Sequence, residues 1–240
     1  MKNCQGKKGG GGGGARRGAA RLLRLLFPLG LVFCLASAPA RALDGAPSLS
    51  EPLSVLWKFE TERTVNLTPA AEGGVVYLPL SSGTLMSLRG EDGQLLWKQD
   101  TGGEFSAAPD ADARGVYVAT ELGPPSKTNL PRATGALRAL SRRSGITLWM
   151  RTLQSPIRGA LASDQETLFG GASDGRVYAV RKDRGDVVWM SQLSPAFVSQ
   201  PVVEEGRLYL GGEDGALYAL DAKTGKTLWR YQTRGPIRGP

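Results

Sequence analysis

The chain contains five tryptophans, and their spacing is the feature that most constrains its fold. They lie 40, 52, 40 and 40 residues apart, at Trp57, Trp97, Trp149, Trp189 and Trp229. Internal repetition with a period of about 40 residues is typical of propellers and solenoids. The sequence therefore predicts a repeat array.

Each of the last four tryptophans ends the same frame: a glycine, nine residues, a second glycine, three residues and then the tryptophan. A short apolar segment lies between the two glycines of each frame, at residues 85–88, 137–140, 177–180 and 217–220. Because glycine adopts positive φ without steric cost, it is typical of the tight turns between short strands. The paired glycines are Gly83 and Gly93, Gly135 and Gly145, Gly175 and Gly185, and Gly215 and Gly225.

Further apolar segments precede each frame, at residues 74–78, 115–118, 167–169 and 206–210. A unit of 40 residues then holds about four strands of the usual length of roughly five residues. That is the content of one propeller blade. The sequence predicts an all-β chain, a β-propeller of four-stranded blades with about four repeats present, forming a partial or open propeller.

A small residue recurs near the end of each segment between the paired glycines, at Ser87, Ala139, Ala179 and Ala219. A large side chain there would keep neighbouring sheets apart. We expect each tryptophan to be wedged against the next blade, where one large aromatic ring buries roughly 150–250 Å². We interpret the tryptophans as structural and not as ligand-binding residues.

The segment from Ala219 to Trp229 resembles the tryptophan-docking motif of the PQQ-like β-propeller repeats, Ala-x-Asp-x-x-Thr-Gly-x-x-x-Trp. That family includes quinoprotein alcohol dehydrogenases, the outer-membrane assembly scaffold BamB, which this chain most resembles, and extracytoplasmic sensor domains of some kinases. In this copy the motif residues are Asp221, Thr224 and Gly225. The other copies replace Asp and Thr, and we expect their turns to be held less tightly; the replacements are Arg89 and Asp92, Ser141 and Ser144, and Arg181 and Arg184.

The first 42 residues have the composition of a secretory signal peptide. They contain eight Lys or Arg and no acidic residue, and they include an apolar run over residues 25–38 that is followed by Ala40-Arg41-Ala42. This run is shorter than the roughly 20 residues that span a bilayer. We expect cleavage after Ala42, a linker over residues 43–51 and repeats over 52–240, with export to the periplasm or the extracellular space. An uncleaved membrane anchor is the alternative.

Removing that leader changes the charge balance of the chain. Of 30 basic and 22 acidic residues, the leader holds eight basic and no acidic ones, so 22 of each remain. A formally neutral remainder gives no support for a nucleic-acid-binding face. We interpret the local group Arg138, Arg142 and Arg143 as a solvated turn.

The residue types present limit the chemistry that can be assigned. The sequence has no His, and its two cysteines, Cys4 and Cys34, both lie in the leader. Histidine-based triads, cysteine nucleophiles and cysteine zinc sites are therefore excluded after cleavage. The adjacent cysteine pair of the quinoprotein dehydrogenases is missing as well. We predict no catalytic, cofactor-binding or metal-ligating residue, and we interpret Asp110 with Asp112 as a solvated turn.

The longer second unit indicates an insertion of about 12 residues over 123–134. Loops on rigid scaffolds often carry recognition. Lys127, Asn129 and Arg132 are our candidate contacts for a protein partner, and a tolerated insertion is the alternative.

The two ends of the array also suggest an interface. Residues 55–59 read as a tryptophan strand with no blade before it, and residues 235–240 repeat the pattern of 155–160. An open array would expose strand edges and blade faces and could self-associate.

Three functions are compatible with the sequence. We favour a noncatalytic exported scaffold that binds protein partners through loops or strand edges, with a BamB-like role in outer-membrane protein assembly. Membrane association would then come only through a partner or an unseen segment. The alternatives are the N-terminal part of a PQQ-dependent dehydrogenase and the sensor domain of a transmembrane kinase, because fold alone does not choose among functions.

Overall fold

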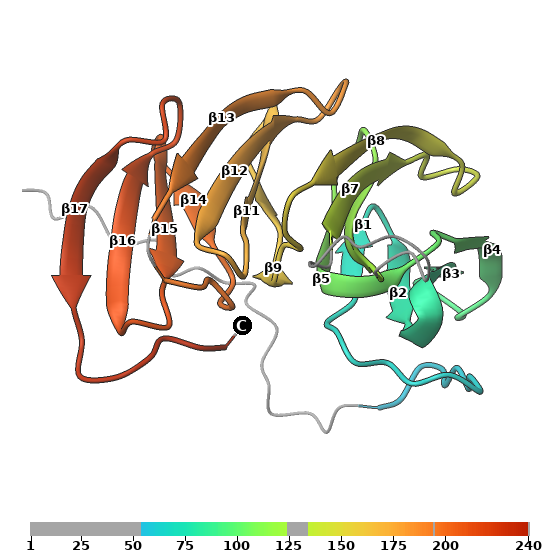
Figure 1. The fold of residues 1–240 in the computed structure, drawn as a ribbon. Coiled ribbons are helices and arrows are strands. Elements are labelled where there is room, and N and C mark those ends of the chain that lie inside the picture. Colours follow the sequence, from blue (N-terminus) through green and yellow to red (C-terminus); the bar gives the residue numbers. More distant parts are fainter. Residues whose placement is uncertain (1–53, 124–133, 194, 240) are drawn as a thin grey trace, which may run out of the picture. The chain divides into compact units, whose positions relative to one another are not determined.

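The computed structural model describes residues 54–123, 134–193 and 195–239, and this part of the chain is built almost entirely of β-strands (Figure 1). The one helical element within it is a short 3-10 turn, η1 (Ser81–Gly83). No helix in the described part is long and apolar enough to cross a bilayer. The strands form four successive sheets, one per repeat, so the architecture is an open β-propeller with about four blades.

The strands follow the predicted frame of glycines and tryptophans. The first blade contains β1 (Ala70–Glu72), β2 (Val75–Leu80), β3 (Thr84–Arg89) and β4 (Leu95–Asp100). The second contains β5 (Glu104–Ala111), β6 (Val116–Leu122), β7 (Thr134–Leu140) and β8 (Thr147–Leu153), with β9 (Gly159–Ala160) added beside β5. The third contains β10 (Ala162–Ser163), β11 (Thr167–Gly171), β12 (Arg176–Arg181) and β13 (Val187–Gln192). The fourth contains β14 (Val202–Glu204), β15 (Arg207–Gly211), β16 (Ala216–Asp221) and β17 (Thr227–Gln232).

Every blade is an antiparallel meander whose strands pair in the order of the sequence. Among the described strands, one pairing is parallel, and it joins β9 to β5 through Ala107 with Gly159 and Ala108 with Ala160. This pairing ties the chain entering the third blade to the first strand of the second blade.

The recurring small residue sits directly across from the tryptophan of its own blade. In the third blade Ala179 of β12 pairs with Trp189 of β13, and the register shifts immediately after Ala179. The same pairing and the same β-bulge occur in the other three blades. Since a bulge bends the strand and increases its twist, each blade turns its outer strand at the same place.

The hydrophobic core lies between the sheets, because successive side chains of a strand point to opposite faces. Along β12, Tyr178 and Val180 belong to a cluster shared with the second blade, while Val177 and Ala179 belong to one shared with the fourth. The interior strands are therefore apolar on both faces, which is why they read as continuous apolar runs.

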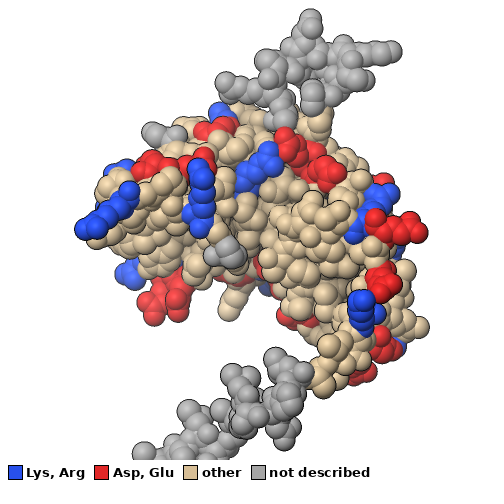
Figure 2. All heavy atoms as spheres, turned by 90° about the horizontal axis from the view of Figure 1, so that it is seen from below, with Lys and Arg blue, Asp and Glu red and all other residues tan. Residues whose placement is uncertain are grey.

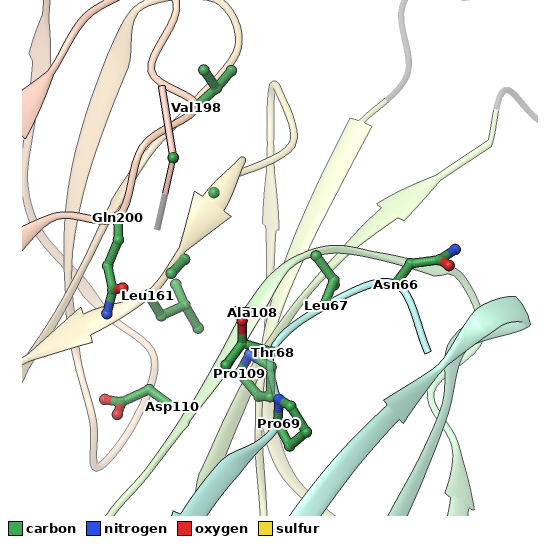
Figure 3. A pocket seen from close by; sticks show the side chains of 13 residues that line it. Asn66, Leu67, Thr68, Pro69, Ala108, Pro109, Asp110, Leu161, Val198 and Gln200 are labelled. Carbon is green, nitrogen blue, oxygen red and sulfur yellow. The ribbon is translucent and has the colours of Figure 1, made fainter. Parts of the chain in front are cut away.

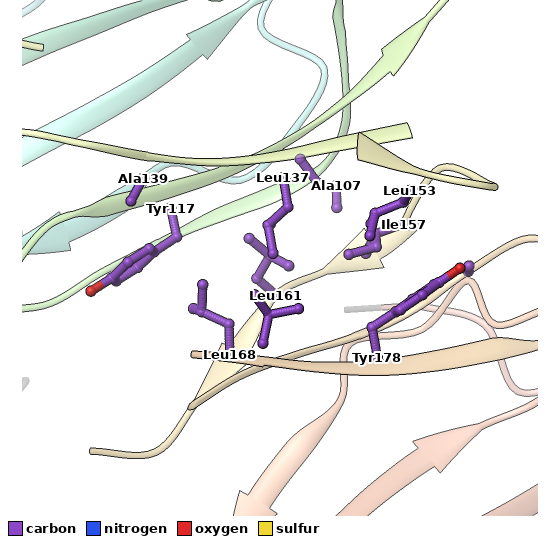
Figure 4. Close-up of a cluster of buried hydrophobic side chains, with 12 residues drawn as sticks. Ala107, Tyr117, Leu137, Ala139, Leu153, Ile157, Leu161, Leu168 and Tyr178 are labelled. Atoms are coloured by element: carbon purple, nitrogen blue, oxygen red, sulfur yellow. The ribbon is translucent and has the colours of Figure 1, made fainter. Parts of the chain in front are cut away.

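Figure 4 shows the cluster between the second and third blades. Tyr117 and Leu137 of the second blade meet Leu168 and Tyr178 of the third. Comparable clusters lie between the first and second blades and between the third and fourth.

One predicted element is absent. Residues 55–59, expected as a tryptophan strand, form no strand, and Val55 and Leu56 are 84% and 83% exposed. A strand requires a hydrogen-bonded neighbour, and none pairs with this segment among the residues that the structure describes. The predicted leader over residues 1–42 and the linker lie outside the described residues.

Candidate functional site: blade interfaces, a central pocket and a polar groove

Four of the tryptophans contact the turn of the following blade in the same way. The indole Nε1 of each donates a hydrogen bond to the carbonyl oxygen three residues before that turn's glycine. Trp97 donates to Arg142 over 2.7 Å, Trp149 to Lys182 over 2.7 Å and Trp189 to Ala222 over 2.9 Å. Trp57 makes the same bond to Gly90 over 2.7 Å, although its segment forms no strand.

The turn glycines leave room for these rings. A Cβ atom on Gly93, Gly145, Gly185 or Gly225 would lie 2.5–2.7 Å from the Cε3 atom of the tryptophan that docks there. All four glycines also have φ between +70° and +73°, a backbone conformation that disfavours other residues. The position therefore needs glycine for two independent reasons.

Two side chains located two residues after a tryptophan extend the same contact. Arg151 Nε donates to the carbonyl oxygen of Gly185 over 2.7 Å, and Ser191 Oγ donates to that of Gly225 over 2.6 Å. Sequence reasoning missed this position, because Arg and Ser share no obvious chemistry. The sequence signal that could have identified this position is that both residues lie two positions after a tryptophan.

The turn of the fourth blade is held by the motif residues themselves. Asp221 Oδ1 accepts hydrogen bonds from the hydroxyl and the backbone N–H of Thr224, both over 2.8 Å. These hydrogen bonds lower the pKa of the Asp221 carboxyl, and the bond from the Thr224 hydroxyl has the largest effect. In the first blade an ion pair over 2.9 Å between Arg89 and Asp92 occupies the corresponding turn.

Trp229 differs from the other tryptophans because no described blade follows it. It packs against Tyr209 of its own blade with ring centroids 5.9 Å apart, and it stays 43% exposed. The structure brings four of the five predicted docking tryptophans to a glycine turn. Trp229 contacts no such turn among the described residues.

A buried ion pair joins the second and third blades. Lys182, whose side chain is 2% exposed, places Nζ 2.8 Å from Asp112 Oδ2 and 5.5 Å from the centre of the Tyr117 ring. Burial alone would raise the pKa of the Asp112 carboxyl. The hydrogen bond from Lys182 and those from the N–H groups of Arg114 and Gly115 outweigh that effect and lower it.

The interpretation of Asp110 and Asp112 as a solvated turn is wrong for Asp110, whereas Asp112 lies in the turn after β5 and pairs with Lys182. Asp110 lies on β5, and its Oδ2 atom is buried without a hydrogen-bond partner. Burial raises the pKa of the Asp110 carboxyl, against the hydrogen bond from Ser163 and the charge of Lys182. The sequence predicted no strand over residues 104–111, whereas β5 covers that range and so includes Asp110.

Asp110 lines a central pocket of about 360 Å³, shown in Figure 3. The other walls come from the segment leading into β1 and from residues near the first strands of the later blades, including Leu67, Leu161 and Gln200. Asp110 is the one charged side chain in this lining. The lining therefore comes from β5 and β9 of the second blade and from the segments next to the other three blades.

A polar groove of about 460 Å³ lies between the second and third blades, beside the end of β6. Glu121 and Arg158 face each other across it with Oε2 and Nη2 2.6 Å apart, and both side chains are about one-third exposed. Ser155 and Ser173 share a hydrogen bond in the same lining. The predicted insertion begins two residues after Glu121, and its candidate contacts Lys127, Asn129 and Arg132 lie outside the described residues.

The predicted solvated turn of three arginines is also wrong in part. Arg138 is 7% exposed on β7 and donates to Thr120 Oγ1 over 2.5 Å, and burial lowers the pKa of its guanidinium. Arg142 donates to the Tyr77 hydroxyl over 3.1 Å. The strand register turns the Arg138 side chain inward. The prediction placed it in solvent because the side chain is charged.

Charges of both signs are interspersed on the face shown in Figure 2. In the described part of the chain, no group of three or more Cys, Asp or Glu side chains is arranged to hold a metal ion.

Comparison with known proteins places the chain in a family. A family model described as outer membrane protein assembly factor BamB matches residues 51–130 and 133–239. The outer membrane protein assembly factor BamB of Shewanella oneidensis is 33% identical over 107 residues, which are 42% of this chain and 24% of that protein. The match therefore spans about a quarter of that relative's length.

Solved structures share the fold at lower identity. BamB from Moraxella catarrhalis is 20% identical with a TM-score of 0.57, over 78% of this chain and 70% of that one. The quinohemoprotein alcohol dehydrogenase ADHIIG from Pseudomonas putida HK5 is 18% identical with a TM-score of 0.59, over 76% of this chain and 36% of that one. With the family model covering most of its length, the chain belongs to the PQQ-like β-propeller family described as outer membrane protein assembly factor BamB.

Proposed function

We propose that this protein is a noncatalytic, exported β-propeller that binds protein partners and acts in outer-membrane protein assembly, in the manner that the name of its family indicates. Family membership supports the assembly role. The binding role is supported by a frame of interlocked blades with a polar groove, whose residue Glu121 precedes the predicted insertion by two positions in the sequence.

The observation that carries this proposal is the pair formed by Glu121 and Arg158. Each side chain is about one-third exposed, so each keeps hydrogen-bonding capacity that a partner can use. Glu121 is held on β6 of the second blade, and Arg158 lies in the segment after β8, where its backbone N–H donates to the carbonyl oxygen of Gly171 in the third blade. The same groove also offers the hydroxyls of Ser155 and Ser173. Polar groups fixed in this way bind a partner's backbone or charged side chains with little loss of conformational freedom.

The dehydrogenase alternative requires a site for the quinone cofactor, and the central pocket does not fit one. PQQ is a polyanion, so its binding requires cationic or hydrogen-bond-donating side chains. The pocket lining offers the hydrogen-bond donors of Asn66, Thr68 and Gln200, but it contains the carboxylate of Asp110 and no Lys or Arg that would neutralise the charges of the cofactor. The described residues therefore provide no reason to assign a quinone reaction to this pocket.

We further propose that export begins with cleavage after Ala42 and that the repeats start near residue 52. The order of basic, apolar and small residues in the leader supports this boundary. N-terminal sequencing of the protein purified from its source should read Leu43, and an N-terminus upstream of residue 25 would contradict cleavage.

The binding role is tested by capture from an envelope extract with three variants. Arg158→Glu reverses one charge in the groove, and deletion of residues 123–134 removes the insertion. Arg184→Glu is the matched control, because this arginine is on an exposed turn away from the groove and its side chain is 65% exposed. Mass spectrometry quantifies each partner relative to the unmodified protein.

We expect the first two variants to reduce capture of the same partner by about tenfold or more, equivalent to about 1.4 kcal/mol. The control should capture that partner at the normal level. If all the variants unfolded normally on heating and captured the partner equally well, neither the groove nor the insertion would be a binding site for that partner.

A further inference from the structure

A pocket of about 690 Å³ lies between the first and second blades, and it shares no lining residue with the central pocket or the polar groove. Its wall on the first blade is largely apolar and includes Leu96 and Trp97 of β4. Its wall on the second blade is cationic, with Arg114 from the turn after β5 and with Arg142 and Arg143 from the turn after β7. A volume of this size is typical of pockets that hold a small molecule.

The three arginines of this pocket keep their positive charge largely uncompensated. Within the residues that the structure describes, no Asp or Glu side chain lines the pocket, and none of the three arginines forms an ion pair. Arginines on the corresponding turns of the first and third blades do form ion pairs. Two carboxylates, Glu72 and Asp112, act on the charge of Arg142 from outside the lining, but Asp112 is already paired with Lys182.

The guanidinium of Arg142 is held in place by the first blade. Its Nε atom donates to the Tyr77 hydroxyl over 3.1 Å, and its Nη2 atom donates to the carbonyl oxygen of Glu72 over 3.0 Å. The backbone carbonyl of Arg142 accepts the hydrogen bond from Trp97 Nε1 over 2.7 Å. An arginine carries five N–H donors, so the others remain for a ligand. A side chain fixed in this way loses little conformational freedom on binding.

The position of this guanidinium depends on the absence of a side chain at Gly73. A Cβ atom on Gly73 would lie 2.6 Å from Arg142 Nη2, whereas a Cβ atom on Gly74 would have no atom within 4 Å. Both glycines have positive φ, +56° and +75°. Alanine at either position is therefore strained, but only alanine at position 73 displaces Arg142.

We propose that this pocket binds a phosphate group carried by a molecule with an apolar part. A phosphomonoester has a charge of about −1.5 to −2 near pH 7, which three guanidinium groups match better than they match the single charge of a carboxylate. Arginine donates parallel N–H groups to phosphate oxygens, while Leu96 and Trp97 contact the apolar part. The phosphate belongs either to a soluble phosphoester or to a lipid headgroup. This inference goes beyond the proposed scaffold role, because no residue of the polar groove lines the pocket.

The test is isothermal titration calorimetry with phenyl phosphate in a buffer without phosphate. Concentrations up to about 10 mM nearly saturate a site whose Kd is about 1 mM. Phenol and inorganic phosphate each carry one half of this probe, and both should bind about tenfold more weakly or less. Phenol binding as tightly as phenyl phosphate would overturn the role of the phosphate, and inorganic phosphate doing so would overturn the role of the apolar wall.

A second arm distinguishes the two sources of the phosphate. The protein is sedimented with phosphatidylcholine vesicles that contain or lack phosphatidic acid, whose headgroup is a phosphomonoester. Cosedimentation that requires phosphatidic acid would support a lipid headgroup, and binding of phenyl phosphate without cosedimentation would support a soluble phosphoester. Binding in neither arm would overturn the proposal.

Charge removal tests whether the arginines make the site. Arg114→Gln together with Arg143→Gln removes two exposed guanidinium groups and should weaken binding about tenfold or more, because hydrogen bonds to charged groups are lost. Arg181→Gln together with Arg184→Gln is the matched control, because it removes the same charge from the corresponding turn of the third blade. Equal weakening by the two double variants would overturn the proposal.

A pair of glycine variants tests the positioning of Arg142. Gly73→Ala should weaken binding about tenfold, because the methyl group displaces the guanidinium from the pocket. Gly74→Ala carries the same kind of backbone strain and should leave binding unchanged. Thermal unfolding of both variants checks that they fold. Equal binding by the two glycine variants would remove Arg142 from the site and overturn the proposal.

Discussion

At the residue scale, each blade interface depends on the contact between one indole ring and one glycine. Gly225 and Gly206 allow this contact to be separated from backbone strain. Both have positive φ, +70° and +73°, but an added Cβ meets Trp189 Cε3 at 2.5 Å on Gly225 and no atom within 4 Å on Gly206.

Substituting these two glycines by alanine should therefore give different losses of stability. Gly206→Ala should cost about 1 kcal/mol from the left-handed backbone alone. Gly225→Ala should cost a further 1–3 kcal/mol or so, because the methyl group pushes the ring away. Chemical denaturation measures both, and equal losses would mean that the ring contact contributes nothing to stability.

The carboxyl of Asp110 gives a second prediction at this scale. Burial raises its pKa, so the folded state holds the proton more strongly than the unfolded state does. The resulting destabilisation is absent below the unfolded pKa of about 3.9, grows as pH rises to the folded pKa, and is complete above it.

Asp110→Asn removes that charge and should stabilise the protein at neutral pH. The gain in unfolding free energy should shrink as pH falls through the folded pKa and vanish near the unfolded one. Thermal unfolding between pH 3 and 8 or so, the range covering both states, checks this. A variant that is less stable than the parent at neutral pH would show that the hydrogen bond from Ser163 and the charge of Lys182 outweigh the cost of burying the Asp110 carboxylate.

At the scale of the elements, the second and third blades are joined by Lys182 and Asp112 in addition to their apolar cluster. Lys182→Met should lower the free energy of unfolding by on the order of 2 kcal/mol. This loss is below the usual cost of breaking a buried ion pair, because the Asp112 side chain is 27% exposed. The loss should be smaller at pH below the folded pKa of Asp112, where that carboxylate is protonated.

The matched control for this pair is Arg181→Met. It breaks the ion pair between Arg181 and Asp183, and both of those side chains are about half exposed. It should cost less than about 0.5 kcal/mol. If urea unfolding gave the same loss for both substitutions, the buried pair would have no special part in joining the blades.

The repeat frame allowed the interior strands to be predicted, because glycine turns and tryptophans mark where each of them begins and ends. Residues 55–59 could not be predicted, since a strand depends on a neighbour that this segment does not find. Arg138 was placed in solvent because its charge outweighed the alternation of the strand, and Asp110 because no strand was predicted there. The groove at Glu121 and Arg158 was missed because these two residues are 37 positions apart in the sequence and belong to no shared motif.

At the scale of the whole molecule, the fold is a series of blades, each fastened to the next by a tryptophan. This organisation has a direction: every described interface is made by the outer strand of one blade on the turn of the following blade. The fourth blade therefore ends the described series with a docking ring and no turn to receive it. Stability should accumulate through the interfaces between neighbours, as in other repeat proteins.

The measurement that tests this account most directly is the reactivity of all five tryptophans toward hydroxyl radicals, read by mass spectrometry on the dilute native protein. Trp97, Trp149 and Trp189 should be protected, and Trp229 should be the most reactive. Protection of Trp229 equal to that of Trp189, or full reactivity of the three interblade rings, would contradict the directional series of docked blades.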